Sequence, residues 1–124
     1  MSINCKGIRK FNGGDKLKYV YICSPYRGDV DYNIAKAQFY CQFATGQGVI
    51  PIAPHIYFTQ FLDDDEPEER RLGLDMGLDI LKHCAELWVF GNRISEGMRT
   101  EIEAAKRLEI PVLFHSNRCK KIGE

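Results

Sequence analysis

The chain has 124 residues, with 17 basic against 17 acidic side chains, and 44% of its residues are apolar. This length fits one globular domain built around a single core and leaves little room for a second domain. Because the net charge is zero and the basic and acidic residues are interspersed, we expect neither a nucleic-acid polymer nor an anionic membrane as a partner.

The cysteines and the apolar runs bear on the compartment. Five cysteines are widely spaced, with no C-x-x-C pair and no matching histidine spacing, which indicates neither a disulfide framework nor a zinc site. Residues 1–10 have no apolar core of a secretory signal, and runs such as residues 87–90 are far shorter than the roughly 20 residues of a membrane helix. We therefore expect a cytoplasmic protein.

The first elements form a strand and a helix. Residues 1–18 are polar and contain glycines, which predicts a loose lead-in. The β-branched and aromatic run at 19–23 predicts a buried strand. A helix over 32–45 follows, capped by Asp29 or Asp31, with apolar residues at helical spacing and glycines after its last turn.

The second strand is predicted over 49–53. Pro51 favours an outer position for it, because proline cannot donate a hydrogen bond to a neighbouring strand. The aromatic segment 55–62 and the acidic segment 63–67 are too long for a simple connection and predict a lid or rim. We expect the acidic residues to be solvated, since their spacing does not match a calcium-binding loop.

A helix is predicted over 68–83, but its apolar residues fall on two arcs. One arc can pack on a sheet, whereas the other needs a different partner. In so short a chain we expect that partner to be a second subunit, in a homodimer or a higher homo-oligomer. The arcs consist of Leu72, Met76 and Ile80 on one side and Leu74, Leu78 and Leu81 on the other.

The remaining elements are a strand at 86–91, a helix at 95–109 and a strand at 110–114. Apolar strands that alternate with helices predict a parallel sheet covered on both faces. We therefore predict a single α/β domain over 19–124. It is Rossmann-like or flavodoxin-like, with a mainly parallel sheet of four to five strands and helices on both faces.

The loop after the first strand is a candidate ligand site, because open parallel sheets bind ligands beyond the carboxyl ends of their strands. This loop runs from Ser24 through Tyr26 and Arg27 to Gly28, and its N–H groups and guanidinium can hold a phosphate. The loop lacks the standard glycine-rich phosphate motifs, so an ordinary surface ion pair is the alternative for Arg27. His55, after the second strand, either contacts the ligand or packs within its aromatic loop.

The segment from Ser95 through Gly97 and Met98 to Glu101 carries the strongest signal. Helical periodicity places Glu101 inside the apolar arc, which directs a carboxylate toward the core. A buried carboxylate is costly unless it has a partner, and the first turn of a helix reduces that cost. Such a group suits a nucleophile or electrostatic catalyst at a sugar carbon, or it merely caps its helix or pairs with an arginine.

Asp75 and Asp79 stand one turn apart on the helix before it. Asp79 borders the arc of Leu72, Met76 and Ile80. Either aspartate is a candidate second carboxyl, a general acid or an acceptor for a ribose hydroxyl. A solvated position on the helix surface is the alternative for both.

The loop of residues 24–28, the strand of 84–91 and the Ser-x-Gly-Met-x-x-Glu pattern of 95–101 resemble the nucleoside 2-deoxyribosyltransferase superfamily. The sequence looks most like the small, largely uncharacterised bacterial and phage branch of that superfamily, a domain of unknown function. The resemblance covers about residues 18–114.

This resemblance implies roles for several residues. It makes Glu101 the nucleophile that attacks the anomeric carbon. Arg27, Gly28 and Ser95 match phosphate-contacting residues of relatives that hydrolyse 2'-deoxynucleoside 5'-monophosphates, and a serine at 95 favours a phosphorylated ligand. Asp79 is the nearest match to the superfamily acid, with a shorter interval to Ser95. Relatives that are dimers or higher oligomers imply a homo-oligomer.

The predicted function is therefore cleavage or transfer at the N-glycosidic bond of a (deoxy)nucleoside 5'-monophosphate or a nucleoside. It needs neither a metal nor another cofactor. A non-catalytic pocket for a nucleotide or nucleotide-derived signal is the alternative, and an interaction module is a third interpretation. Glu101 and Asp79 are the predicted catalytic residues, and the predicted substrate-binding residues are Ser24, Tyr26, Arg27, Gly28, His55, Ser95, Gly97 and Met98.

Overall fold

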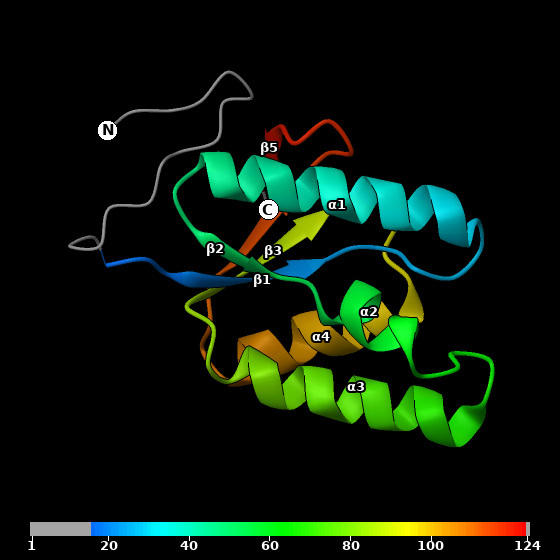
Figure 1. Ribbon diagram of the computed structural model, residues 1–124. Helices are drawn as coiled ribbons and strands as arrows, with labels where there is room; N and C mark the ends of the chain where they lie inside the picture. Colours follow the sequence, from blue (N-terminus) through cyan, green and yellow to red (C-terminus); the bar gives the residue numbers. More distant parts are fainter. Residues whose placement is uncertain (1–15, 124) are drawn as a thin grey trace.

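The computed structural model describes residues 16–123 and is built on a sheet with the strand order β2-β1-β3-β4-β5 (Figure 1). The predicted lead-in falls mostly on residues 1–15, which lie outside the described residues. Four strands are parallel, and the last is antiparallel to its neighbour. The strands are β1 (Tyr19–Cys23), β2 (Ile50–Ile52), β3 (Glu86–Phe90), β4 (Val112–His115) and β5 (Lys121–Ile122).

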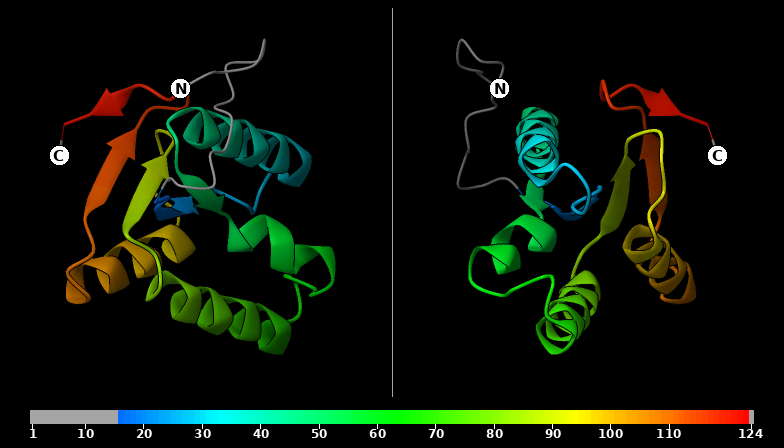
Figure 2. Two further views of the ribbon diagram at one scale, coloured as in Figure 1. Left: turned by 60° about the vertical axis from the view of Figure 1, so that its left-hand side comes forward. Right: turned by 90° about the vertical axis from the view of Figure 1, so that its right-hand side faces the viewer.

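The helices lie on both faces of this sheet. One face carries α1, and the other carries α3 and α4 (Figure 2). The predicted α/β class with a mainly parallel sheet and two covered faces is therefore confirmed. The helices are α1 (Val30–Gly46), α2 (Pro54–Tyr57), the 3₁₀ turn η1 (Phe58–Gln60), α3 (Pro67–Leu81) and α4 (Glu96–Arg107).

Alternation along the buried strands divides the core into two clusters. On β1, Val20 and Ile22 face α1, whereas Tyr21 and Cys23 face α3 and α4. This arrangement follows from the pleat, which directs successive side chains to opposite faces. Because both faces of β1 are covered, four consecutive side chains of this strand are buried.

The buried face of α1 differs from the predicted pattern. The inner face of α1 is formed by Ala37, Tyr40 and Ala44, and the sequence pattern missed Tyr40. The Tyr40 ring stacks on Phe90 at a centroid distance of 4.4 Å. Asp29 is the cap of α1, since its carboxylate accepts a hydrogen bond from the Tyr32 N–H.

The two arcs of α3 have different surroundings. Leu78, Ile80 and Leu81 pack in the core, so the predicted division of the apolar residues between the arcs is not kept at Ile80. Leu72 is 49% exposed on the outer arc. That a second subunit covers this arc stays a prediction.

The aromatic segment after β2 is helical rather than a loop. Pro54 occupies the first turn of α2, where the missing N–H of a proline costs no hydrogen bond. Pro51 lies on β2 at the edge of the sheet, as predicted. The final parallel strand begins at Val112, later than predicted, because the turn after α4 includes Glu109 at φ 58° and is followed by Pro111.

Among residues 16–123, no helix combines the length and the apolar character that crossing a bilayer requires.

Candidate active site

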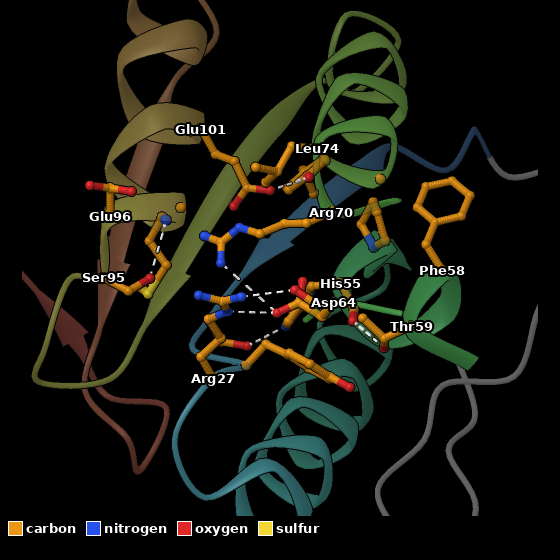
Figure 3. A pocket seen from close by; sticks show the side chains of 17 residues that line it. Arg27, His55, Phe58, Thr59, Asp64, Arg70, Leu74, Ser95, Glu96 and Glu101 are labelled. Carbon is orange, nitrogen blue, oxygen red and sulfur yellow. Dashed lines mark hydrogen bonds and ion pairs between the residues drawn. The ribbon is translucent and has the colours of Figure 1, made fainter. Parts of the chain in front are cut away.

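A cavity of about 320 Å³ opens at the carboxyl ends of the strands, on the side of the sheet that carries α3 and α4 (Figure 3). Its walls come from the end of β1, the aromatic segment α2–η1, the first half of α3 and the N-terminus of α4. Apolar side chains form one part of the wall, namely Pro54, Phe58, Leu74 and Met98. Polar and charged side chains form the rest, among them Arg27, Asp64, Arg70, Ser95 and Glu101.

Glu101 faces inward, as the periodicity of its helix predicts. It lines the cavity, while its neighbours Met98, Ile102 and Ala105 pack in the core. The hydroxyl of Tyr21 on β1 donates a hydrogen bond to the Glu101 carboxylate. Two elements therefore position this carboxylate, namely its own helix α4 and strand β1 of the sheet.

Burial sets the protonation of this carboxyl. It raises the pKa of Glu101 to about 7, although hydrogen bonds from Tyr21 and Cys23 act in the opposite direction. Burial and the nearby carboxylate raise the pKa of Tyr21 well above its usual range, so its hydroxyl stays a neutral donor. Near pH 7 the Glu101 carboxyl is present in both its protonated and its ionised form.

A glycine of α3 makes room for this hydrogen bond. Gly77 is buried against β1, and a Cβ atom there would lie 2.9 Å from the Tyr21 hydroxyl oxygen. Real Cβ atoms essentially never approach another atom so closely. Glycine at this position is therefore required for the observed place of the Tyr21 hydroxyl.

The basic side chains of the cavity converge on one aspartate. Arg27 Nε donates to Asp64 Oδ2 at 2.7 Å, and Arg27 Nη2 donates to the Asp64 backbone carbonyl at 2.8 Å. Arg70 Nη1 lies 4.0 Å from the same carboxylate oxygen (Figure 3). Arg27 thus forms an ion pair, which was one of the two alternatives, and its contact with a phosphate stays a prediction.

The acidic segment differs here from the predicted solvated run. Asp64 lines the cavity with a side chain that is 24% exposed. Its contacts with two arginines from different elements explain its partial burial, because a carboxylate leaves water only when it is paired. Within residues 16–123, no group of three or more His, Cys, Asp or Glu residues is arranged to hold a metal ion.

Ser95 caps α4 at the mouth of the cavity. Its Oγ accepts a hydrogen bond from the Met98 N–H at 3.3 Å, which is the usual contact of an N-cap serine. Ser95, Gly97 and Met98 all line the cavity. The helix α4 therefore begins directly after Ser95, where the sequence predicted its first turn.

Two other predicted residues contact each other. Ser24 Oγ lies 2.8 Å from His55 Nε2, and both residues line the cavity. Burial lowers the pKa of His55 to about 4, so its imidazole is neutral at pH 7. Tyr26 also lines the cavity, whereas Gly28, at φ 104°, borders two neighbouring hollows instead.

Asp79, the predicted catalytic partner of Glu101, lies away from the cavity, and its role stays a prediction that this arrangement does not support. Its side chain is 69% exposed, lies 3.5 Å from Lys82 Nζ and does not line the cavity. Asp75 is likewise exposed and pairs with Arg71. Both positions lie on the surface of α3, because the buried side of this helix is formed by Gly77 and Leu81.

Besides apolar wall residues such as Phe58 and Leu74, sequence reasoning missed four residues that determine the polar contacts of the site. Tyr21 reads as part of an apolar strand, and Asp64 reads as part of a solvated acidic run. Arg70 lies in the first part of a helix whose charged residues give no directional signal. Gly77 carried the one available signal, since a glycine inside a helix costs about 1 kcal/mol relative to alanine and asks for a packing reason.

The fold and the site together define a class. A sheet of order 2-1-3-4-5 with a ligand-sized cavity at the carboxyl ends of its parallel strands is a flavodoxin-like α/β arrangement. Residues 18–115 match the family described as Domain of unknown function (DUF7768), and the chain belongs to this family.

A solved structure shares this fold. It is the 2-deoxyribosyltransferase from the psychrotolerant bacterium Bacillus psychrosaccharolyticus, described as a suitable biocatalyst for the industrial synthesis of antiviral and antitumoral nucleosides. The TM-score is 0.59 at 19% sequence identity, and the match covers 79% of this chain and 72% of the other. The resemblance predicted from the sequence is thus confirmed in the fold. No curated protein matches the sequence.

Proposed function

We propose that the protein cleaves or transfers a glycosyl group at the N-glycosidic bond of a nucleoside 5'-phosphate, of which the monophosphate is the minimal form. Glu101 is the nucleophile. The observation that carries this proposal is the position of Glu101, turned into a cavity at the sheet edge and held there by the Tyr21 hydroxyl. The 2-deoxyribosyltransferase that shares the fold supports the class of reaction.

The reaction proceeds in two displacements. An ionised Glu101 oxygen attacks C1' of the sugar, and the electron pair of the C1'–N bond leaves with the base, which takes up a proton from water. Water or an acceptor base then attacks C1' and displaces the Glu101 carboxylate. Hydrolysis and transfer differ only in this second nucleophile.

The remaining wall provides the binding contacts. The apolar side, with Phe58 and Leu74, suits the flat face of a base. The 5'-phosphate lies at the charged end beside Arg27 and Ser95, where Arg70 adds a second guanidinium and Gly28 borders the adjoining hollow. For this the phosphate has to replace the Asp64 carboxylate as the partner of the arginines.

Product analysis tests the proposal. The protein is incubated with nucleosides and with 2'-deoxynucleoside and nucleoside 5'-monophosphates, and the free base is measured by chromatography, alone and with a second base as acceptor. We expect base release by the wild type and its loss in Glu101→Ala. Equal release by Glu101→Ala, or no release from any compound, contradicts the proposal.

A binding protein without catalysis is the second candidate. The position of Asp79 outside the cavity favours it, because the expected carboxyl partner of Glu101 is missing from the site. In that case nucleotides raise the melting temperature, since a ligand that binds only the folded state stabilises it, while no base is released.

A further inference from the structure

We propose that a second hollow at the same sheet edge binds the distal phosphates of a nucleoside di- or triphosphate, whose first phosphate lies at Arg27. This inference rests on the proposed function, because it extends the substrate of the same site. It adds a binding site on the α1 side of the sheet, which the cleavage of a monophosphate does not need.

The second hollow adjoins the cavity of Glu101 directly. It measures about 530 Å³ and lies among the loop after β1, the first turns of α1, the loop after β3 and the turn after β4. Arg27 and Ser95 line both spaces. A ligand group held at these two residues can therefore continue into the second hollow without crossing the sheet.

The charges of this hollow favour a polyanion. Among residues 16–123, Arg27, Lys36 and Arg93 line it, and Asp29 is the single carboxylate residue that does so. Asp29 is already engaged, because it accepts the N–H of Tyr32 at 3.2 Å as the cap of α1. Arg93 is exposed and forms no ion pair within residues 16–123, so its guanidinium is open to a ligand.

The space on the other side of Arg27 has the opposite charge. A hollow of about 560 Å³ is lined there by the three consecutive aspartates 63–65 together with Arg27. The cavity of Glu101 itself contains Asp64 and Glu96 besides its two arginines. A chain of phosphates that starts at Arg27 is therefore repelled on one side and attracted on the side of Arg93 and Lys36.

A buried hydroxyl in this hollow gives an independent indication of a ligand. Tyr40 lines the hollow and is 2% exposed, yet its hydroxyl has no hydrogen-bond partner within residues 16–123. Buried polar groups are almost always paired, so an unpaired hydroxyl asks for a partner from outside the protein. Burial raises the pKa of Tyr40 to about 12, which keeps it a neutral donor toward a phosphate oxygen.

Lys36 is held at the edge of the same hollow. Its ammonium donates to the Asn117 backbone carbonyl at 2.7 Å and lies 5.3 Å from the centre of the Tyr40 ring. An ammonium has three donors, and the carbonyl takes one of them. The Tyr40 hydroxyl and the Lys36 ammonium thus offer two kinds of donor to one phosphate group.

Inorganic anions test the hollow without any assumption about the base. We measure binding of pyrophosphate and of phosphate by calorimetry, and we expect pyrophosphate to bind the wild type about tenfold more tightly. Arg93→Gln and Lys36→Gln should each remove most of this preference. Arg99→Gln is the matched control, because it deletes the same charge from the exposed side of α4.

The inference is overturned if the wild type binds pyrophosphate no more tightly than phosphate. It is also overturned if Arg93→Gln and Arg99→Gln reduce the preference equally, because net charge alone then explains it. Tyr40→Phe provides the second measurement. It should weaken pyrophosphate binding while the melting temperature of the free protein stays the same or rises, because an unpaired buried hydroxyl contributes no stability.

A fall in the melting temperature of free Tyr40→Phe contradicts the inference, since it reveals an internal partner for the hydroxyl. Nucleotides then separate this inference from the proposed function. If base is released from monophosphates and diphosphates with equal kcat/KM, the second hollow is contradicted and the proposed cleavage of the N-glycosidic bond still holds. If diphosphates bind tightly but no compound releases its base, the proposed function is contradicted and the proposed phosphate site in the second hollow still holds.

Discussion

The hydroxyl of Tyr21 on β1 donates a hydrogen bond to the carboxylate of Glu101 on α4, across the layer of side chains between sheet and helix. This contact opposes the effect of burial on the Glu101 pKa, which is nevertheless raised to about 7. The same contact fixes the carboxylate at the end of the cavity. Tyr21 is therefore a positioning residue that also adjusts the fraction of ionised Glu101.

Replacing Tyr21 by phenylalanine should change the pH dependence of base release. The wild-type rate should rise with pH and level off above a pKa of about 7, because only ionised Glu101 attacks. Loss of the hydrogen bond raises this pKa, and a rise of about one pH unit lowers kcat/KM about fivefold at pH 7. The pH–rate profile measures this shift.

The recovery at high pH distinguishes positioning from general damage. The rate of Tyr21→Phe should approach the wild-type rate about two pH units above the pKa of Glu101 in this variant. Tyr19→Phe on the same strand is the control, since Tyr19 is 51% exposed. A loss in Tyr21→Phe that is equal at every pH argues against an effect on the ionisation of Glu101.

Replacing Gly77 by alanine should displace the Tyr21 hydroxyl. The new Cβ would lie 2.9 Å from that oxygen, so either the buried Tyr21 side chain or α3 has to shift to relieve the overlap. We expect a loss of about 1 to 3 kcal/mol in unfolding free energy and a weaker Tyr21–Glu101 contact. Urea unfolding measures the first effect.

Gly73→Ala is the matched control on the same helix. Its Cβ would lie 3.6 Å from Leu62 Cδ1, an ordinary van der Waals distance. Alanine has the higher helix propensity, so this variant should be as stable as the wild type or more stable by about 1 kcal/mol. If both variants lose the same stability, the close approach to Tyr21 is not the cause.

The sequence predicted the fold better than it predicted the site. Apolar strands alternating with amphipathic helices define the sheet, because burial on both faces leaves a strong pattern. The inward direction of Glu101 was also predictable, since it depends only on the period of one helix. Both inferences use local spacing.

The missed residues depend on contacts between distant segments. Tyr21 and Glu101 are separated by 80 positions, and Arg27 and Asp64 by 37. No local pattern indicates that a tyrosine in an apolar strand meets a carboxylate. Asp79 lies on the exposed side of α3, whose buried residues are Gly77 and Leu81, and helical periodicity alone does not show which side of this helix faces the sheet.

Stability should fall as the pH rises through the Glu101 titration. Folding raises the pKa of this carboxyl from 4.5 to about 7, so the folded state binds more protons than the unfolded state in this range. The stabilisation that the raised pKa of Glu101 gives to the folded state is complete below about pH 4.5 and is lost above about pH 7. Its full size is on the order of 3 kcal/mol.

His55 acts in the opposite direction and has to be separated. Folding lowers its pKa from 6.5 to about 4, so its contribution is complete above pH 6.5 and is lost as the pH falls. Glu101→Gln isolates the carboxyl, because the His55 term is common to both proteins. From pH 5 to pH 8 the stability of Glu101→Gln relative to the wild type should rise, and a constant difference in urea unfolding would disprove the raised pKa.

Replacing Asp64 by asparagine should strengthen binding of phosphorylated ligands. The Asp64 carboxylate now occupies Arg27 at 2.7 Å and lies 4.0 Å from Arg70. A bound phosphate competes with it for these guanidinium groups, so loss of the charge releases two cations for the ligand. We expect about a tenfold lower Kd for a nucleoside 5'-monophosphate and no change for the nucleoside.

Calorimetric titration of both compounds checks this expectation. Asp75→Asn is the matched control, because it removes one carboxylate that pairs with Arg71 on the exposed side of α3 and does not line the cavity. A gain that is the same for Asp64→Asn and Asp75→Asn reflects net charge alone. A gain for the nucleoside as large as that for the monophosphate would place the effect of Asp64 on the sugar or base, and would remove the arginines from the phosphate site.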